Sequence, residues 1–167
     1  TGMKLIVGAE FQLDDGPRLV LLCENKAGYT ALCGLITRGR RASAKGTYRL
    51  HRADLADGVP GTFALWLPGR EPDIAHGRWM RDTFAGRAWL AVELHHGPDD
   101  AGRLRELQRL GHSLDLPLVA AGDVHMHVRR RLALQNTLTA IRHRVPLAEA
   151  GALIFRNGER HLRRREA

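Results

Sequence analysis

Short apolar runs alternate with helix-like stretches along this chain, and that alternation most constrains its fold. The apolar runs lie at residues 4–13, 19–23, 63–67, 88–94 and 118–121. Helical spacing of apolar side chains is found at residues 26–42, 73–84, 99–114, 129–142 and 147–153. Such alternation predicts an α/β fold with a largely parallel sheet. In the helix at 129–142, we expect Leu132, Leu138 and Ile141 to face inward.

Composition sets the class of protein. A chain of 167 residues is long enough for one domain with a hydrophobic core. It has no run near the about 18 apolar residues of a membrane span, and no signal-peptide pattern. Cys23 and Cys33, the only two cysteines, lie in apolar surroundings without a CxxC spacing. We therefore expect reduced thiols in a cytoplasmic protein with no membrane partner.

Positive charge is concentrated near the end of the chain. The net charge is +8, and residues 126–167 contain ten arginines against three glutamates. A second basic run at residues 38–52 contains no acidic residue. Such patches suit a polyanion such as nucleic acid. The candidate contacts are Arg129, Arg130, Arg131, Arg142 and Arg144. Only Tyr48 and Phe155 interleave with these basic stretches, too few aromatic residues for a base-stacking platform, so merely solvated arginines remain an alternative.

The run at residues 118–121 leads into an aspartate and a histidine, Asp123 and His125. Positions i and i+2 of a strand share a face, and ends of parallel strands converge on one edge. Glu10, in the first predicted strand, is expected at the same edge. Two carboxylates and an imidazole suit zinc, manganese or magnesium. The alternative is that Asp123 caps a turn and His125 packs beside it.

Three further histidines lie near predicted strand ends. His127 falls beyond the strand and is interpreted as a surface side chain. His95 and His96 are adjacent, so only one of them is expected to line the strand-end face. The sequence has neither a GxSxG nucleophile motif nor a glycine-rich phosphate loop.

Several stretches have sequences that resemble those of a known family. They are residues 4–11, 16–22, 28–32, 121–127, 134–142 and 157–163. In this order they resemble the PHP (polymerase and histidinol phosphatase) domain of bacterial C-family DNA polymerases, over essentially the whole chain. Residues 64–69 and 123–127 are more similar to the error-prone, damage-induced branch of that family than to its replicative alpha subunit.

This resemblance implies a fold and a role. Residues 1–145 would form a partial, distorted TIM-like (β/α) PHP barrel, and residues 146–167 a basic extension toward the polymerase domains. Metal-competent members of the family act as phosphoesterases or 3′–5′ exonucleases. The parent enzyme would be a DNA-directed DNA polymerase of translesion synthesis and damage-induced mutagenesis. Its nucleotidyl-transfer aspartates lie in a separate palm domain.

The chain departs from the family pattern at its metal ligands. The family has H-x-H and H-D motifs before the glutamate matched by Glu10, whereas this chain has no histidine there. Arg18 stands where the family has its next histidine, and the family cysteine falls near Leu67 or Pro68. Glu10, Asp123 and His125 are therefore predicted to be vestigial ligands, with no cofactor firmly expected. We expect an accessory, structural fragment that lacks the first barrel strands; a metal-dependent phosphoesterase or exonuclease is the alternative.

A barrel without its first strands would expose a sheet edge and an apolar face. We therefore expect the isolated chain to self-associate along that edge or to be marginally stable. Light scattering and a thermal melt measure both properties. A monodisperse monomer that melts well above the usual mesophile range would contradict the expectation.

Overall fold

The computed structural model describes residue 2 and residues 5–163. Its contacts divide the chain into two compact units. The first unit comprises residues 1–92 and 105–119, and the second comprises residues 93–104 and 120–167. The predicted domain division at residues 145 and 146 stays a prediction.

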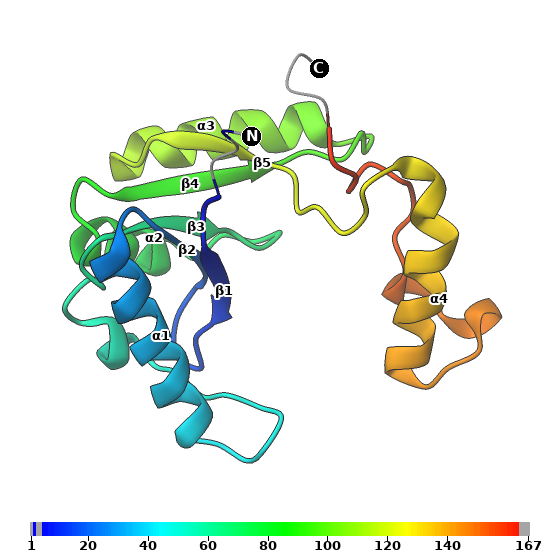
Figure 1. Ribbon diagram of the computed structural model, residues 1–167. Coiled ribbons are helices and arrows are strands. Elements are labelled where there is room, and N and C mark those ends of the chain that lie inside the picture. Colours follow the sequence, from blue (N-terminus) through cyan, green and yellow to red (C-terminus); the bar gives the residue numbers. More distant parts are fainter. Residues whose placement is uncertain (1, 3–4, 164–167) are drawn as a thin grey trace. The chain divides into compact units, whose positions relative to one another are not determined.

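The described residues form five strands and four α-helices, so the predicted α/β class is confirmed (Figure 1). The strands are β1 (Gly8–Gln12), β2 (Arg18–Cys23), β3 (Thr62–Leu67), β4 (Ala88–Glu93) and β5 (Leu118–Ala121). The helices are α1 (Lys26–Arg41), α2 (Ile74–Thr83), α3 (Asp100–Leu114) and α4 (Leu132–His143). A short 3-10 helix, η1 (Arg52–Leu55), lies between α1 and β3.

The sheet is open and mixed, with the strand order β1-β2-β3-β4-β5. β2 runs antiparallel to both β1 and β3, and β3 runs parallel to β4. The prediction of a largely parallel sheet is therefore wrong. The physical reason is local at β1 and β2: the turn at residues 13–17 allows a hairpin, whereas a parallel pair needs a crossover of a dozen or more residues.

One face of the sheet carries the core of the first unit. Leu19, Leu21 and Ala64 are fully buried there, and Trp66 is almost so. Helix α2 approaches this face closely because it has a glycine, Gly77, at the contact. A Cβ at Gly77 would lie 2.6 Å from the Trp66 ring and 2.4 Å from Leu114 of α3. Two helices therefore pack on the face that holds Trp66.

β1 forms one edge of the sheet. It begins at Gly8, later than predicted; Lys4, the predicted start, lies outside the described residues. Leu5 and Ile6 precede it and are 88% and 67% exposed. The Cys23 main-chain N–H still donates to the Val7 carbonyl oxygen at 2.8 Å. In the described part of the chain, no strand pairs with the outer edge of β1. Self-association through it stays a prediction.

The end of the chain contains less regular helix than predicted. The stretch at 147–153 is two 3-10 turns, η3 (Leu147–Glu149) and η4 (Gly151–Leu153), because Gly151 has a φ of +45°, which a continuous right-handed helix does not allow. A 3-10 turn, η2 (Arg129–Arg131), precedes α4. Thr139 and Ala140 are buried in α4, whereas Leu138 and Ile141 are 50% and 66% exposed. The expected inward stripe of this helix is therefore wrong.

Two expectations from composition have a structural counterpart. No helix in the described part of the chain has both the length and the apolar character of a membrane span. Cys23 and Cys33 are free thiols, each half-buried. Burial raises the pKa of the Cys23 thiol above its usual value, which favours its protonated form.

Helix α1 offers a matched pair of glycines for a packing test. A Cβ at Gly28 would lie 1.9 Å from the Gly61 carbonyl oxygen, whereas Gly34 has open space around it. We expect Gly28→Ala to lower the unfolding free energy by about 1–3 kcal/mol through overpacking. Gly34→Ala should raise it by about 0.5–1 kcal/mol through helix propensity. Urea denaturation followed by circular dichroism measures both, and equal effects would contradict this packing.

Candidate functional site

The structure brings Asp123 and His125 together in the second unit. His125 Nε2 donates a hydrogen bond to Asp123 Oδ1 at 3.0 Å. Both residues follow the end of β5, and Asp123 has a left-handed φ of +43°, so a shared strand face does not explain their proximity. Aspartate is one of the residue types that tolerate this backbone conformation. The pair was expected from the sequence, but irregular backbone after β5 forms it in place of a strand face.

The second oxygen of the Asp123 carboxylate is taken by an arginine. Arg160 Nε donates to Asp123 Oδ2 at 2.6 Å. The two side chains are 26% and 23% exposed, so solvent screens the pair only in part. The Arg160 guanidinium also lies 4.4 Å from the Phe155 ring centroid, and the His125 ring meets that phenyl ring edge-on at 4.9 Å. Phe155 therefore contacts both partners of the carboxylate.

Backbone pairing holds Arg160 in place. Its carbonyl oxygen accepts from the His125 and Met126 N–H groups at 2.9 and 3.2 Å. The Leu162 N–H donates to the Met126 carbonyl oxygen at 2.9 Å, and Met126 forms a parallel bridge with His161. Two of the stretches that carry the family resemblance, at 121–127 and 157–163, thus lie side by side. The ion pair between Arg160 and Asp123 joins the same two segments through their side chains.

The surroundings of Asp123 favour its ionised form, and those of His95 favour its neutral form. Burial raises the pKa of Asp123, but the Arg160 hydrogen bond and the charges of His125 and Arg160 outweigh it, so the pKa lies below its usual 3.8. His95 Nε2 donates to the Gly122 carbonyl oxygen at 3.2 Å. Burial lowers the pKa of His95 below 6.5, although that hydrogen bond opposes the shift. His95 thus favours its neutral form.

Glu10, the third predicted ligand, belongs to the first unit. It is exposed on β1, and its Oε1 lies 3.6 Å from Arg18 Nε on β2. Among the described residues, no group of three or more His, Cys, Asp and Glu side chains gathers as a metal ion would need. The metal role of Glu10, Asp123 and His125 stays a prediction. What the structure shows is that each of the two carboxylates has an arginine beside it.

The remaining histidines have separate surroundings. His95 lies beside Gly122, as described, and its own carbonyl oxygen accepts from Asn157 Nδ2 at 2.7 Å. His96 has a positive φ of 54° and turns toward Glu159, with 3.6 Å between His96 Nε2 and Glu159 Oε2. His127 is exposed, as predicted.

The five arginines predicted to contact DNA fall into two groups. All five are exposed. Arg129, Arg130 and Arg131 form η2 at the start of α4, whereas Arg142 and Arg144 lie at its end. At a rise of about 1.5 Å per residue, Arg130 and Arg142 are about 18 Å apart along the helix. Their DNA contacts stay a prediction, but they do not form one patch.

Sequence reasoning missed three residues that shape this region: Phe155, Glu159 and Arg160. The only signal was the resemblance at residues 157–163, which marked the segment without a role for any side chain. Pairing between segments more than 30 residues apart has no local sequence pattern, because it depends on tertiary packing.

Comparison with known proteins gives the family context. The chain is 60% identical to the Error-prone DNA polymerase of Pseudomonas fluorescens (strain Pf-5) over 163 residues, or 98% of the chain. It is 57% identical over its whole length to that of Xanthomonas oryzae pv. oryzae, and 56% identical over 98% of its length to that of Pseudomonas savastanoi pv. phaseolicola. This chain is homologous to one segment of error-prone DNA polymerases.

The homology confirms the resemblance to the error-prone branch. The chain spans 16% of the length of each of these curated relatives. A comparison with protein-family models finds no match. The homology therefore covers only a small part of each relative.

Replacing Arg160 tests the ion pair, with Arg156, an exposed arginine in the same unit, as the matched control. We expect Arg160→Gln to reduce the local opening free energy, read from hydrogen exchange of the Leu162 amide, by about 1–3 kcal/mol, because the half-buried Asp123 carboxylate loses its charged hydrogen-bond donor and keeps only His125. Arg156→Gln should change it by less than about 0.5 kcal/mol.

Acid should abolish the difference in local opening free energy between the Arg160→Gln variant and the unsubstituted chain. The pKa of Asp123 is depressed, so the contribution of the pair is complete above 3.8, the unfolded value, and disappears as the pH falls through the folded pKa. A difference that persists unchanged at the acidic end would show that Arg160 acts through packing on Phe155 instead.

Proposed function

We propose that this chain is the accessory, structural PHP-domain portion of a cytoplasmic error-prone DNA polymerase that acts in translesion synthesis and damage-induced mutagenesis. The observation that carries the non-catalytic role is the arginine beside each predicted carboxylate ligand. Arg160 hydrogen-bonds to Asp123, and Arg18 lies 3.6 Å from Glu10. The open sheet with helices packed on the Trp66 face is compatible with part of a distorted barrel.

A guanidinium on a carboxylate is a poor setting for a metal ion. Arginine keeps its charge at every accessible pH, so it cannot yield its place by losing a proton. A divalent cation at Asp123 would have to displace Arg160 or share one carboxylate with it, at a cost in repulsion. His125 also directs a donor N–H, and not a lone pair, at that carboxylate. Both predicted ligands are thus committed to interactions inside the protein.

The polymerase role rests on the relatives' names. Relatives at 56–60% identity are called Error-prone DNA polymerase, and they are about six times longer than this chain. By the resemblance to this family, the nucleotidyl-transfer aspartates would lie in a separate palm domain. We therefore propose that the parent enzyme is a DNA-directed DNA polymerase and that this portion braces it.

An exposed apolar stripe on α4 supports contact with other domains of the parent. Leu134, Leu138 and Ile141 recur at helical spacing and are 48%, 50% and 66% exposed. Exposed apolar patches of this kind mark protein–protein contacts. The same helix is bordered by arginines at both ends, which suits an acidic surface on a neighbouring domain.

Calorimetric titration with Zn²⁺, Mn²⁺ and Mg²⁺ tests the non-catalytic role. We expect no stoichiometric binding of micromolar or tighter affinity and no metal-stimulated hydrolysis of a phosphodiester such as bis-p-nitrophenyl phosphate. Asp123→Asn should give the same titration as the parent chain.

Tight, stoichiometric metal uptake that Asp123→Asn abolishes would contradict this proposal. Together with phosphodiester hydrolysis, it would favour the alternative function, a metal-dependent phosphoesterase or 3′–5′ exonuclease.

A further inference from the structure

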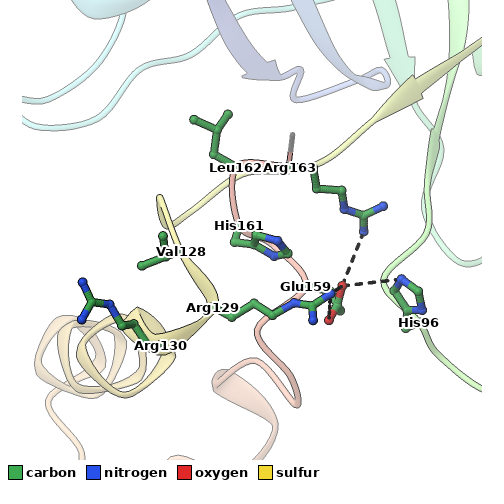
Figure 2. Close-up of a pocket in the computed structure, with 8 residues that line it drawn as sticks. All are labelled: His96, Val128, Arg129, Arg130, Glu159, His161, Leu162 and Arg163. Atoms are coloured by element: carbon green, nitrogen blue, oxygen red, sulfur yellow. Dashed lines mark hydrogen bonds and ion pairs between the residues drawn. The ribbon is translucent and has the colours of Figure 1, made fainter. Parts of the chain in front are cut away.

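A basic pocket of about 670 Å³ lies within the second unit (Figure 2), and Asp123 is not among the residues that line it. Three separate segments build its wall: the loop after β4, the residues at the start of η2, and the irregular stretch at 159–163. Its lining consists of His96, Val128, Arg129, Arg130, Glu159, His161, Leu162 and Arg163. The pocket has three arginines and a single carboxylate, so its formal charge is positive even with both histidines neutral.

One carboxylate organises these cations. Glu159 is only 12% exposed, and Arg129 Nη2 lies 3.1 Å from each of its oxygens. Figure 2 shows Arg163 and His96 converging on the same group, at 4.0 and 3.6 Å, while Arg130 extends away from it. A single negative charge shared in this way positions the cations without neutralising them.

The backbone around Glu159 is fixed before any ligand arrives. The Glu159 N–H donates to Asn157 Oδ1 at 3.1 Å, and Asn157 is itself anchored to the His95 carbonyl oxygen. Arg163 Nη2 donates to the Leu94 carbonyl oxygen at 3.0 Å. Gly158 allows the close approach, because a Cβ there would lie 3.1 Å from the Arg129 carbonyl oxygen. A preorganised site of this kind binds with little ordering cost.

The chemistry of the lining favours a phosphate group. Guanidinium groups match phosphate oxygens with paired, charge-assisted hydrogen bonds. The pocket has no phenyl, phenol or indole ring in its lining, so it offers no base-stacking platform. Such a site would recognise the backbone of a nucleic acid irrespective of its sequence.

We propose that this pocket binds a backbone phosphate of DNA, with Arg130 as its available cation and Arg129 and Arg163 held in place by Glu159. The preference for phosphate rests on the pocket, and the choice of DNA as its source rests on the proposed polymerase parent. Among the arginines predicted to contact DNA, the proposal selects Arg129 and Arg130 and excludes Arg142 and Arg144.

Fluorescence anisotropy with a labelled single-stranded oligothymidylate and the 167-residue chain tests this assignment. Arg130→Gln is the test variant, because Arg130 is exposed and has no ion pair or hydrogen bond within the described residues. Arg142→Gln is the matched control with the same loss of charge. We expect Arg130→Gln to weaken binding about fivefold and to reduce the slope of log affinity against log salt by about 0.7. The control should weaken binding less than about twofold.

Two further ligands identify the source of the phosphate. An abasic oligomer with the same sugar-phosphate backbone should bind within about threefold of the oligothymidylate, and a neutral methylphosphonate oligomer should not bind. Equal losses in both variants, or displacement of the oligomer by equimolar thymidine monophosphate, would overturn the assignment. The metal titration tests the non-catalytic role separately, so either result stands whatever the other shows.

Discussion

The ion pair between Asp123 and Arg160 is the interaction on which the second unit depends. It joins two segments that the chain separates by more than 30 residues, and three main-chain hydrogen bonds reinforce the contact. The same pairing brings Glu159 into position, because Glu159 immediately precedes Arg160. The pairing of these two segments therefore both positions Glu159 in the proposed DNA pocket and places Arg160 on the Asp123 carboxylate.

Three of the arginine–carboxylate pairs, those at Glu10, Asp123 and Glu159, have different consequences for the proposed function. At Glu10 and Asp123, Arg18 and Arg160 lie beside the two carboxylates that the sequence predicts as metal ligands. Glu159 is the only carboxylate among three arginines in the lining of its pocket, and its ion pair with Arg129 holds that arginine at the pocket. A surface ion pair contributes little to stability. Its value here is placement: these pairs decide where positive charge is available and where negative charge is not.

Much of the first unit was predictable because its signals are local. The apolar runs of β2, β3, β4 and β5 gave strands within a residue or so of the observed bounds. Strand direction was not predictable from alternation alone, since a hairpin and a crossover leave similar apolar runs. The inward face of α4 was also wrong, because Leu138 and Ile141 carry a periodicity typical of a core but lie exposed. The proximity of Asp123 and His125 was expected from their i and i+2 spacing. Arg160 could not be predicted as the partner of Asp123, because no local sequence pattern indicates a partner that is distant in the chain.

Anomalous diffraction from crystals grown with Zn²⁺ or Mn²⁺ tests the central claim most directly, namely that Arg160 holds the Asp123 carboxylate in place of a metal ion. The account predicts Arg160 Nε within hydrogen-bonding distance of Asp123 and no anomalous peak between Asp123 and His125. A peak bonded to both side chains, with the Arg160 guanidinium displaced from the carboxylate, would contradict it.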